Sequence, residues 1–301
     1  MNKKIIIIVQ NSNKYPSNLM IPFIKKTWGN NNEIKTIIYQ GDSTEDNLDS
    51  KNILRLKIPG DYEHLTHKLL HCIQWIDKNL EYDYILRTTT TTYIDIDNLK
   101  NLIKTLPPSN LYHSTLVTYP PFPHKKEDEI IFGSGTGTIL SKDIVKLIIN
   151  NLDKWDYTLL DDVAMGKFLT YENNIKLTIG SRQDFKNYPT QKNIDFNNYL
   201  FRYKLSDNLL PRFLEIFIIL TIHLKILNHR KQNLIRTFLI HIIDMVFILI
   251  FNIFYFFNFK RYIPKLKILR NRMLAKIFLQ LKKIKFMQKY FKKIKSSLKK
   301  L

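Results

Sequence analysis

The chain has little cysteine and, in its last third, very little acid. Cys72 is the single cysteine among 301 residues, which excludes an intrachain disulfide and gives no sign of a disulfide-stapled, exported domain. Residues 208–301 contain 21 Lys and Arg against only Glu215 and Asp244, whereas residues 1–207 contain 26 against 24 acids. We therefore expect a near-neutral domain over residues 1–207, followed by a cationic segment over residues 208–301 that must meet anions.

The amino terminus lacks a long apolar run and a small-residue cleavage site, so we expect no secretory signal peptide and a cytoplasmic location. Five β-branched residues at positions 5–9 instead predict a buried first strand. Strand-like runs at 35–39, 52–57, 84–87 and 130–132 alternate with helical patterns at 19–28, 64–78, 97–106 and 141–151. This alternation predicts an α/β domain, with Ser141 capping the last of these helices and a boundary near residues 206–211.

Four motifs in this domain have a recognisable order and spacing. A KKTWG segment ends at Gly29, an SGTGTILS segment begins at Ser134, and LLDDVAMG covers residues 159–166. The longest motif covers residues 60–99, and its characteristic positions are Tyr62, Leu65, Thr66, Lys68, Trp75, Arg87, Thr88, Tyr93, Asn98 and Leu99. Together the four pieces resemble the β-1,3-galactosyltransferase and fringe family of glycosyltransferases.

The resemblance implies the GT-A fold, a Rossmann-like mixed sheet, and transfer of a hexose from a nucleotide sugar, UDP-linked in the first instance. The acceptor would be a hydroxyl of a glycan or of a lipid-linked sugar, and the reaction would be inverting. By the resemblance Asp162 is the catalytic base, because inversion at a sugar carbon needs one carboxylate to deprotonate the acceptor hydroxyl. The alternative for Asp161 and Asp162 is that they cap a helix. The alternative for the whole chain is a catalytically inactive glycan-binding or scaffolding protein on the same fold.

One feature departs from the family pattern. The acids of its metal-binding D-x-D motif are replaced here by Thr89, Thr90 and Thr91. Hard divalent cations require carboxylate oxygens, so we expect no metal site at this position and no cofactor, unless Asp95 or Asp97 holds a cation. The threonines then contact the donor directly through hydroxyl and N–H groups, or they are simply a β-prone strand end.

Without a metal, other groups must neutralise the donor diphosphate. Arginine and lysine can do so, and we expect this of Arg87, Arg202 and Lys204, the last two in the segment NYLFRYK. Gln10 and Lys68 complete the expected donor-binding set. A solvated pair is the alternative for Arg202 and Lys204.

The glycine-rich stretch with Gly133, Ser134 and Gly135 lacks the lysine of a P-loop and does not follow the first strand. We expect it to let the backbone approach the donor or the acceptor closely. The histidines show no metal-ligand spacing. Convergence of Asp162 and the basic set on one cleft would favour an enzyme, whereas their dispersal would favour the inactive alternative.

The basic segment ends in a pattern typical of an amphipathic helix. Apolar residues recur at steps of three or four between Leu266 and Leu298, with Lys and Arg in the intervals. Residues 237–259 are long enough to span a bilayer, but His241 and Asp244 would be costly there, so we favour monotopic attachment over a span. The expected partner of residues 208–301 is an anionic membrane surface. Nucleic acid is a less favoured rival, and a helix packed on the domain or a second subunit is the remaining alternative.

Overall fold

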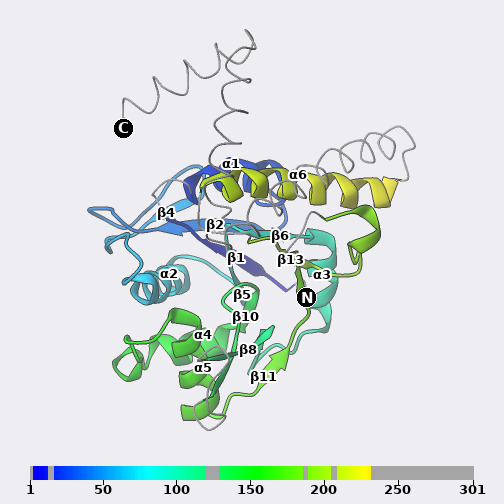
Figure 1. Cartoon of the computed structure of the whole chain (residues 1–301). Helices are drawn as coiled ribbons and strands as arrows, with labels where there is room; N and C mark the ends of the chain where they lie inside the picture. Colours follow the sequence, from blue (N-terminus) through cyan, green and yellow to red (C-terminus); the bar gives the residue numbers. More distant parts are fainter. Residues whose placement is uncertain (1–2, 13–16, 120–128, 186–188, 205–208, 232–301) are drawn as a thin grey trace, which may run out of the picture. The chain divides into compact units, whose positions relative to one another are not determined.

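The computed structural model describes residues 3–12, 17–119, 129–185, 189–204 and 209–231 (Figure 1). The chain divides into two compact units, residues 1–240 and 241–301, and every described residue belongs to the first.

A mixed sheet forms the centre of this unit, and eight of its strands lie in the described part of the chain. In spatial order they are β11 (Leu177–Ile179), β7 (Tyr112–Ser114), β10 (Thr138–Ser141), β5 (Tyr84–Thr89), β1 (Ile5–Gln10), β2 (Lys35–Gln40), β4 (Ile53–Arg55) and β3 (Asn47–Leu48). β1 pairs in parallel with β2 and β5, whereas β10 pairs antiparallel with both β5 and β7. Because β1 is central and covered on both faces, its apolar residues are all buried.

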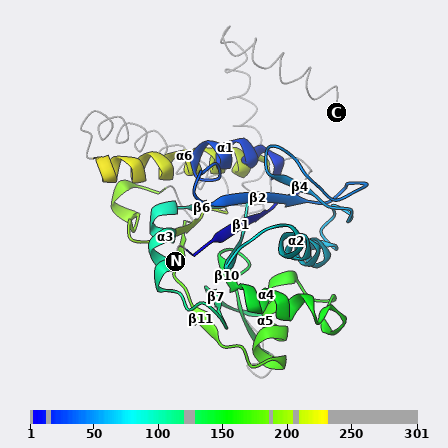
Figure 2. The ribbon, with the colours of Figure 1, turned by 180° about the vertical axis from the view of Figure 1, so that it is seen from behind.

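Helices cover the two faces of the sheet. Figures 1 and 2 show α1 (Ile21–Thr27) and α6 (Leu209–Lys231) together on one side of β1 and β2. On the other side lie α2 (Leu65–Asn79), α4 (Lys142–Ile149) and α5 (Asp161–Gly166). These last three helices share one apolar core with alternate residues of β1 and β2, such as Ile6, Ile8 and Ile37. Every second side chain of these strands thus points to the same face of the sheet and packs against the apolar faces of the helices.

Two smaller sheets flank the main one. β6 (Thr92–Ile94) pairs antiparallel with β13 (Leu200–Arg202), and β13 pairs with β12 (Gln183–Asp184). β8 (Leu116–Tyr119) and β9 (Ile130–Gly133) form an antiparallel pair. The remaining elements are α3 (Ile96–Thr105), three 3₁₀ helices (Ser17–Met20, Leu152–Lys154 and Gln191–Asn193) and a π-helix (Lys167–Glu172). The β6–β13 pairing brings residues 200–203 beside the threonine run.

The α/β fold class is confirmed, although β7, β10 and β11 of the main sheet were not predicted, and two local predictions differ from the structure. The predicted strand at 52–57 is limited to Ile53–Arg55. The predicted cap at Ser141 is wrong, because its Oγ makes no capping bond and instead accepts the N–H of Leu111 at 2.9 Å. Ser141 is the last residue of β10, and its hydroxyl is occupied by the N–H of Leu111, the residue before β7.

Helix α6 packs on the α/β domain rather than beginning a separate part of the chain. It contacts α1 and β6, the Tyr93 hydroxyl and His223 Nδ1 are hydrogen-bonded at 3.0 Å, and Arg230 pairs with Asp97 at 2.6 Å. The division between compact units therefore falls after Ile240, whereas the sequence placed it near residue 207. For residues 209–231, packing of a helix on the domain was the alternative to membrane attachment.

Among the helices described between residues 3 and 231, none combines the length and the apolar character needed to cross a bilayer. The candidate span at 237–259 and the amphipathic pattern from Leu266 to Leu298 lie outside the described residues.

Candidate functional site

A cavity of about 290 Å³ opens at the carboxyl ends of β1 and β5. Gln10 ends β1 and Thr89 ends β5, and both line the cavity. The carboxyl ends of strands are where open α/β sheets bind their ligands. A larger cavity of about 800 Å³ lies at the opposite, amino end of β1, around Lys4 and Ile5, but none of the predicted site residues lines it.

A buried ion pair forms one wall of the smaller cavity. Arg87 Nη2 pairs with Asp161 Oδ2 and also donates to Gln10 Oε1 at 2.5 Å. The pair joins β5, the end of β1 and the start of α5. Burial opposes the charge of the Arg87 guanidinium, but Asp161, Tyr39 and Asp162 together outweigh it and raise the pKa of Arg87. Burial raises the pKa of Asp161, while Arg87 acts in the opposite direction. The positive charge of Arg87 is therefore matched within the protein.

Asp162 has different surroundings from its neighbour. It is partly exposed in the cavity, and its Oδ2 accepts the backbone N–H of Gly135 at 3.0 Å. The capping alternative holds only in part: Asp161 and Asp162 each accept the N–H of the next residue, but the cap position is Leu160, which offers no side-chain acceptor. Asp162 is thus held in a defined orientation while one face of its carboxylate meets the cavity.

The glycine-rich turn is shaped by Arg87. A Cβ atom at Gly135 would overlap the guanidinium of Arg87, so a larger residue there requires Arg87 to move. Gly137 has φ +97°, a conformation that side chains other than glycine rarely adopt. The sequence predicted a close approach of this turn to a ligand. The close approach found in the structure is to Arg87.

The threonine run forms a tight turn at the cavity. Thr89, Thr90 and Thr91 line it, between the end of β5 and the start of β6. Thr89 Oγ1 and Thr91 Oγ1 lie 3.2 Å apart, and the Thr91 carbonyl accepts the N–H of Tyr203 at 3.1 Å. The turn is therefore tied to the segment that carries Arg202 and Lys204.

The side chains at this turn supply no carboxylate oxygen, which is the ligand that a hard divalent cation prefers. Thr89 to Thr91 offer hydroxyls only, and the nearby Asp161 is committed to Arg87. Asp95 and Asp97, the acids expected to hold a cation if one were needed, do not line the cavity and pair with Arg230. In the part of the chain that the structure describes, no group of three or more His, Cys, Asp or Glu side chains has the geometry of a metal site.

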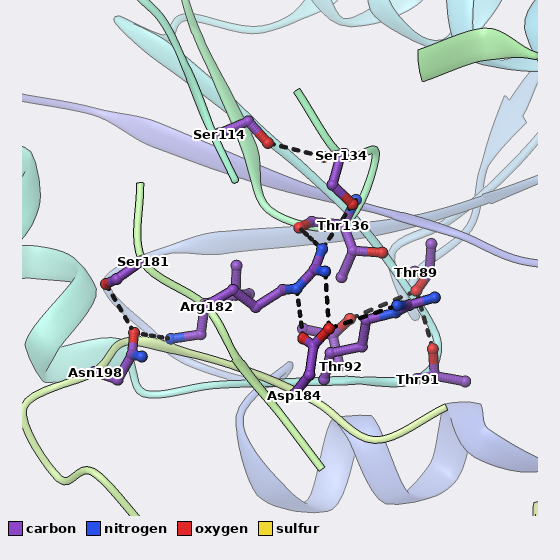
Figure 3. A network of polar contacts seen from close by, with 12 residues as sticks. Thr89, Thr91, Thr92, Ser114, Ser134, Thr136, Ser181, Arg182, Asp184 and Asn198 are labelled. Carbon is purple, nitrogen blue, oxygen red and sulfur yellow. Dashed lines mark hydrogen bonds and ion pairs between the residues drawn. The ribbon is translucent and has the colours of Figure 1, made fainter. Parts of the chain in front are cut away.

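A second polar network joins the glycine-rich turn to the strand that carries Arg202 (Figure 3). Arg182 Nη1 donates to Ser134 Oγ at 2.6 Å and to the Thr136 carbonyl at 3.3 Å. The same guanidinium donates to Asp184 Oδ1 at 2.6 Å and Oδ2 at 2.9 Å, and Asp184 lies 3.7 Å from Arg202 Nη1. Arg182 and Asp184 were not predicted from the sequence, because the residues of the glycine-rich turn that Arg182 contacts, Ser134 and Thr136, are far away in the chain.

Two of the predicted residues lie outside the cavity. Lys68 is buried in α2, and its Nζ donates to the carbonyl oxygens of Gly60 at 3.0 Å and Asp61 at 2.7 Å. Its position holds the segment before Tyr62 rather than a ligand. Gly133 belongs to β9, donates its N–H to the Tyr112 hydroxyl at 2.7 Å, and leaves no room for a Cβ beside Ser114.

The other predicted residues converge. Those that line the single cavity are Gln10, Arg87, Thr89, Thr90, Thr91, Ser134, Gly135, Asp162, Arg202 and Lys204. Residues from five separate segments thus line one cavity of about 290 Å³. Convergence of this kind was expected of an enzyme, whereas dispersal was expected of the inactive alternative.

No protein-family model matches this chain, and no curated protein sequence matches it. Among solved structures, it is similar to a glycosyltransferase involved in the glycosylation of the major capsid of PBCV-1, with 13% identity over 71% of this chain and 98% of that one, at a TM-score of 0.44. It is also similar to the apo form of the glycosyltransferase GlyE of Streptococcus pneumoniae TIGR4, with 12% identity over 59% of this chain and 45% of that one, at a TM-score of 0.34. The mixed-sheet architecture agrees with the α/β, GT-A-like fold class that the sequence predicts. At such identities the function of the cavity must be inferred from its own residues.

Proposed function

We propose that the protein is a glycosyltransferase that moves a hexose from a nucleotide sugar, UDP-linked by the resemblance, to a hydroxyl of a glycan or lipid-linked acceptor. The observation that carries the proposal is the convergence of Asp162 with Arg202, Lys204 and the threonine turn on one cavity at the carboxyl ends of β1 and β5. A carboxylate beside cations is what glycosyl transfer from a diphosphate donor requires.

The reaction needs one base and a good leaving group. The acceptor oxygen forms a bond to the anomeric carbon while the bond from that carbon to the diphosphate oxygen breaks. The electron pair of the broken bond leaves with the diphosphate, and the acceptor proton passes to Asp162. A single displacement of this kind inverts the configuration. We assign the base to Asp162 because Asp161 is buried and paired with Arg87, whereas Asp162 faces the cavity.

The donor side of the site is assigned by charge. We assign the diphosphate to Arg202 and Lys204, because both line the cavity and the Arg202 side chain is 35% exposed, whereas Arg87 is buried against Asp161. Arginine and lysine can neutralise phosphate oxygens without a metal. Arg87 then holds Gln10 and Asp161 in place, and the threonine hydroxyls contact the sugar or the phosphates. Donor binding is accordingly proposed to need no divalent cation.

The test is a panel of nucleotide sugars assayed for hydrolysis, together with calorimetry of UDP binding, each with and without EDTA. The expected result is hydrolysis of at least one donor and a UDP affinity that EDTA leaves unchanged. Binding without turnover of any donor would favour the inactive glycan-binding alternative. Loss of UDP binding in EDTA, restored by Mn²⁺ or Mg²⁺, would refute metal independence but leave glycosyl transfer standing.

A further inference from the structure

Exposed apolar side chains gather at one side of the cavity mouth. Tyr62 is 70% exposed and Leu160 is 41% exposed, and both line the cavity. Tyr157, three residues before Leu160, is also 41% exposed. Exposed apolar side chains beside a cavity are candidates for ligand contact, since apolar surface of this kind is a feature of binding grooves.

Tyr157 belongs to a row of three rings, with His67 and His64. The ring of His67 stacks on that of Tyr157, with centroids 4.6 Å apart and planes inclined by 26°. The ring of His64 lies 5.4 Å from that of His67. We call Tyr62, His64, His67 and Tyr157, together with Leu160, the aromatic strip.

The strip is held by contacts between the start of α2 and the segment before α5. Thr66 Oγ1 donates to the Leu159 carbonyl at 3.4 Å, and the Leu65 N–H donates to the Tyr62 carbonyl at 3.3 Å. Leu65, the first residue of α2, also lines the cavity, so the start of this helix connects the strip with the cavity wall. The Thr66–Leu159 hydrogen bond therefore ties together the two segments that carry these side chains.

The chemistry of the strip suits a sugar ring. Burial, together with the neighbouring His64, lowers the pKa of His67, which favours the neutral form of its ring. Pyranose rings have apolar C–H faces that pack on aromatic rings, while their hydroxyls remain at the edges and reach water or polar groups. Tyrosine and histidine offer an apolar body and a polar tip, which matches both requirements.

We propose that the aromatic strip is the acceptor subsite, which binds the pyranose rings of a glycan and directs its reacting hydroxyl to Asp162. This inference rests on the proposed function. The strip lies on the base side of the cavity, because Leu160 is two residues before Asp162, and the assigned base must face the acceptor. The cations assigned to the donor, Arg202 and Lys204, come from a different segment, β13 and the residues after it.

The test uses the full chain and a printed array of oligosaccharides probed in the presence of UDP. The variants are Tyr62→Ala and Tyr157→Ala, with Tyr171→Ala as the matched control, because Tyr171 is 51% exposed and does not line the cavity. The best-bound soluble glycan is then titrated by calorimetry, and UDP is titrated separately. We expect each strip variant to weaken glycan binding roughly tenfold, with UDP affinity unchanged. The Tyr62→Phe and Tyr157→Phe variants keep the ring and should keep glycan binding.

Three results would overturn the inference. One is glycan binding by both alanine variants at the level of the control. Another is an equal loss of UDP and glycan affinity, which would mean that the strip holds the nucleobase. The third is the absence of any bound glycan for the unaltered protein. If the unaltered protein binds glycans through the strip but binds neither UDP nor any nucleotide sugar, the proposed function fails and the glycan-binding surface stands. Thermal unfolding of each variant checks that the fold is intact.

Discussion

Asp161 and Asp162 are adjacent in the chain but have different partners. Asp161 is buried against Arg87, whereas Asp162 is partly exposed and accepts a single backbone N–H from across the cavity, that of Gly135. We predict that Asp162→Asn lowers kcat roughly 10²–10⁴-fold, the usual contribution of a general base, with little change in UDP affinity. Steady-state kinetics and calorimetry of UDP binding measure the two quantities.

Asp161→Asn is the matched control for this prediction. It leaves the buried Arg87 charge without its carboxylate, so the main effect should be a loss of stability of about 3–5 kcal/mol, seen in chemical unfolding. A reversed pattern, with Asp162→Asn fully active and Asp161→Asn stable but inactive, would mean that the base is Asp161.

Gly135 is predicted to be intolerant of the smallest side chain. Because a Cβ atom there would overlap the Arg87 guanidinium, Gly135→Ala must displace Arg87 from Asp161 and Gln10. We expect a stability loss similar to that of Asp161→Asn and a loss of donor hydrolysis, measured by chemical unfolding and by the hydrolysis assay. A stable and active Gly135→Ala protein would show that Arg87 can leave its position without consequence.

At the scale of secondary-structure elements, Arg182 connects the glycine-rich turn to the β12–β13 pair. Its side chain is 7% exposed, and it contacts Ser134, Thr136 and Asp184. Arg182→Ala removes these contacts and frees the strand that carries Arg202. We therefore predict a raised KM for the donor, with a smaller change in kcat, because the diphosphate contact becomes less well positioned.

The control for Arg182 is Arg55→Ala. Arg55 also pairs with an aspartate, Asp49, at 2.9 Å, but its side chain is 41% exposed and it does not line the cavity. An exposed pair contributes about 0–1 kcal/mol, so Arg55→Ala should change neither KM nor stability measurably. Equal effects of the two substitutions on donor KM would contradict a positioning role for Arg182.

At the scale of the whole molecule, the position of α6 decides where the chain can be cut. Three isoleucines of α6, Ile218, Ile219 and Ile222, are fully buried, and burial of such a side chain contributes about 1.5–3 kcal/mol. We predict that truncation near Ser206 lowers the melting temperature and impairs UDP binding. Truncation after Ile240, where the compact unit ends, should preserve both, as differential scanning calorimetry and UDP titration would show.

Truncation after Ile240 also tests the membrane attachment expected of residues 208–301. Residues 260–301 contain 16 Lys and Arg and no acid, and each such residue near an anionic leaflet contributes about 1 kcal/mol. We expect the full chain to sediment with vesicles of phosphatidylcholine and phosphatidylserine, partly released by high salt, and the protein truncated after Ile240 to remain in solution. Binding that survives salt and alkaline carbonate would argue for a span at residues 237–259 instead. A full chain that ignores vesicles but binds nucleic acid with a steep salt dependence would refute membrane attachment.

The sequence by itself determined the first strands and main helices and most of the residues at the cavity, but not the short strands after residue 106, such as β7 and β10. Five consecutive β-branched residues have little choice but a buried strand, and the apolar spacing from Leu65 to Ile76 suits only a helix. The carboxyl ends of parallel strands lie at the same edge of an α/β sheet, so the residues that end β1 and β5 must lie near each other. The charge of residues 208–301 is likewise fixed by composition.

Only the tertiary structure decided which partners these residues take. Arg87 pairs with Asp161 across 74 positions of sequence, and Arg182 reaches Ser134 across 48. Nothing local distinguishes Arg87 as the partner of a carboxylate from Arg87 as a ligand for phosphate, since a guanidinium serves both equally well. Ser141 bonds to Leu111 instead of capping a helix, and α6 joins the domain rather than the tail, for the same reason. Local pattern sets what a segment can form, and the contacts between distant segments, which depend on the folded geometry, select among the partners that its side chains allow.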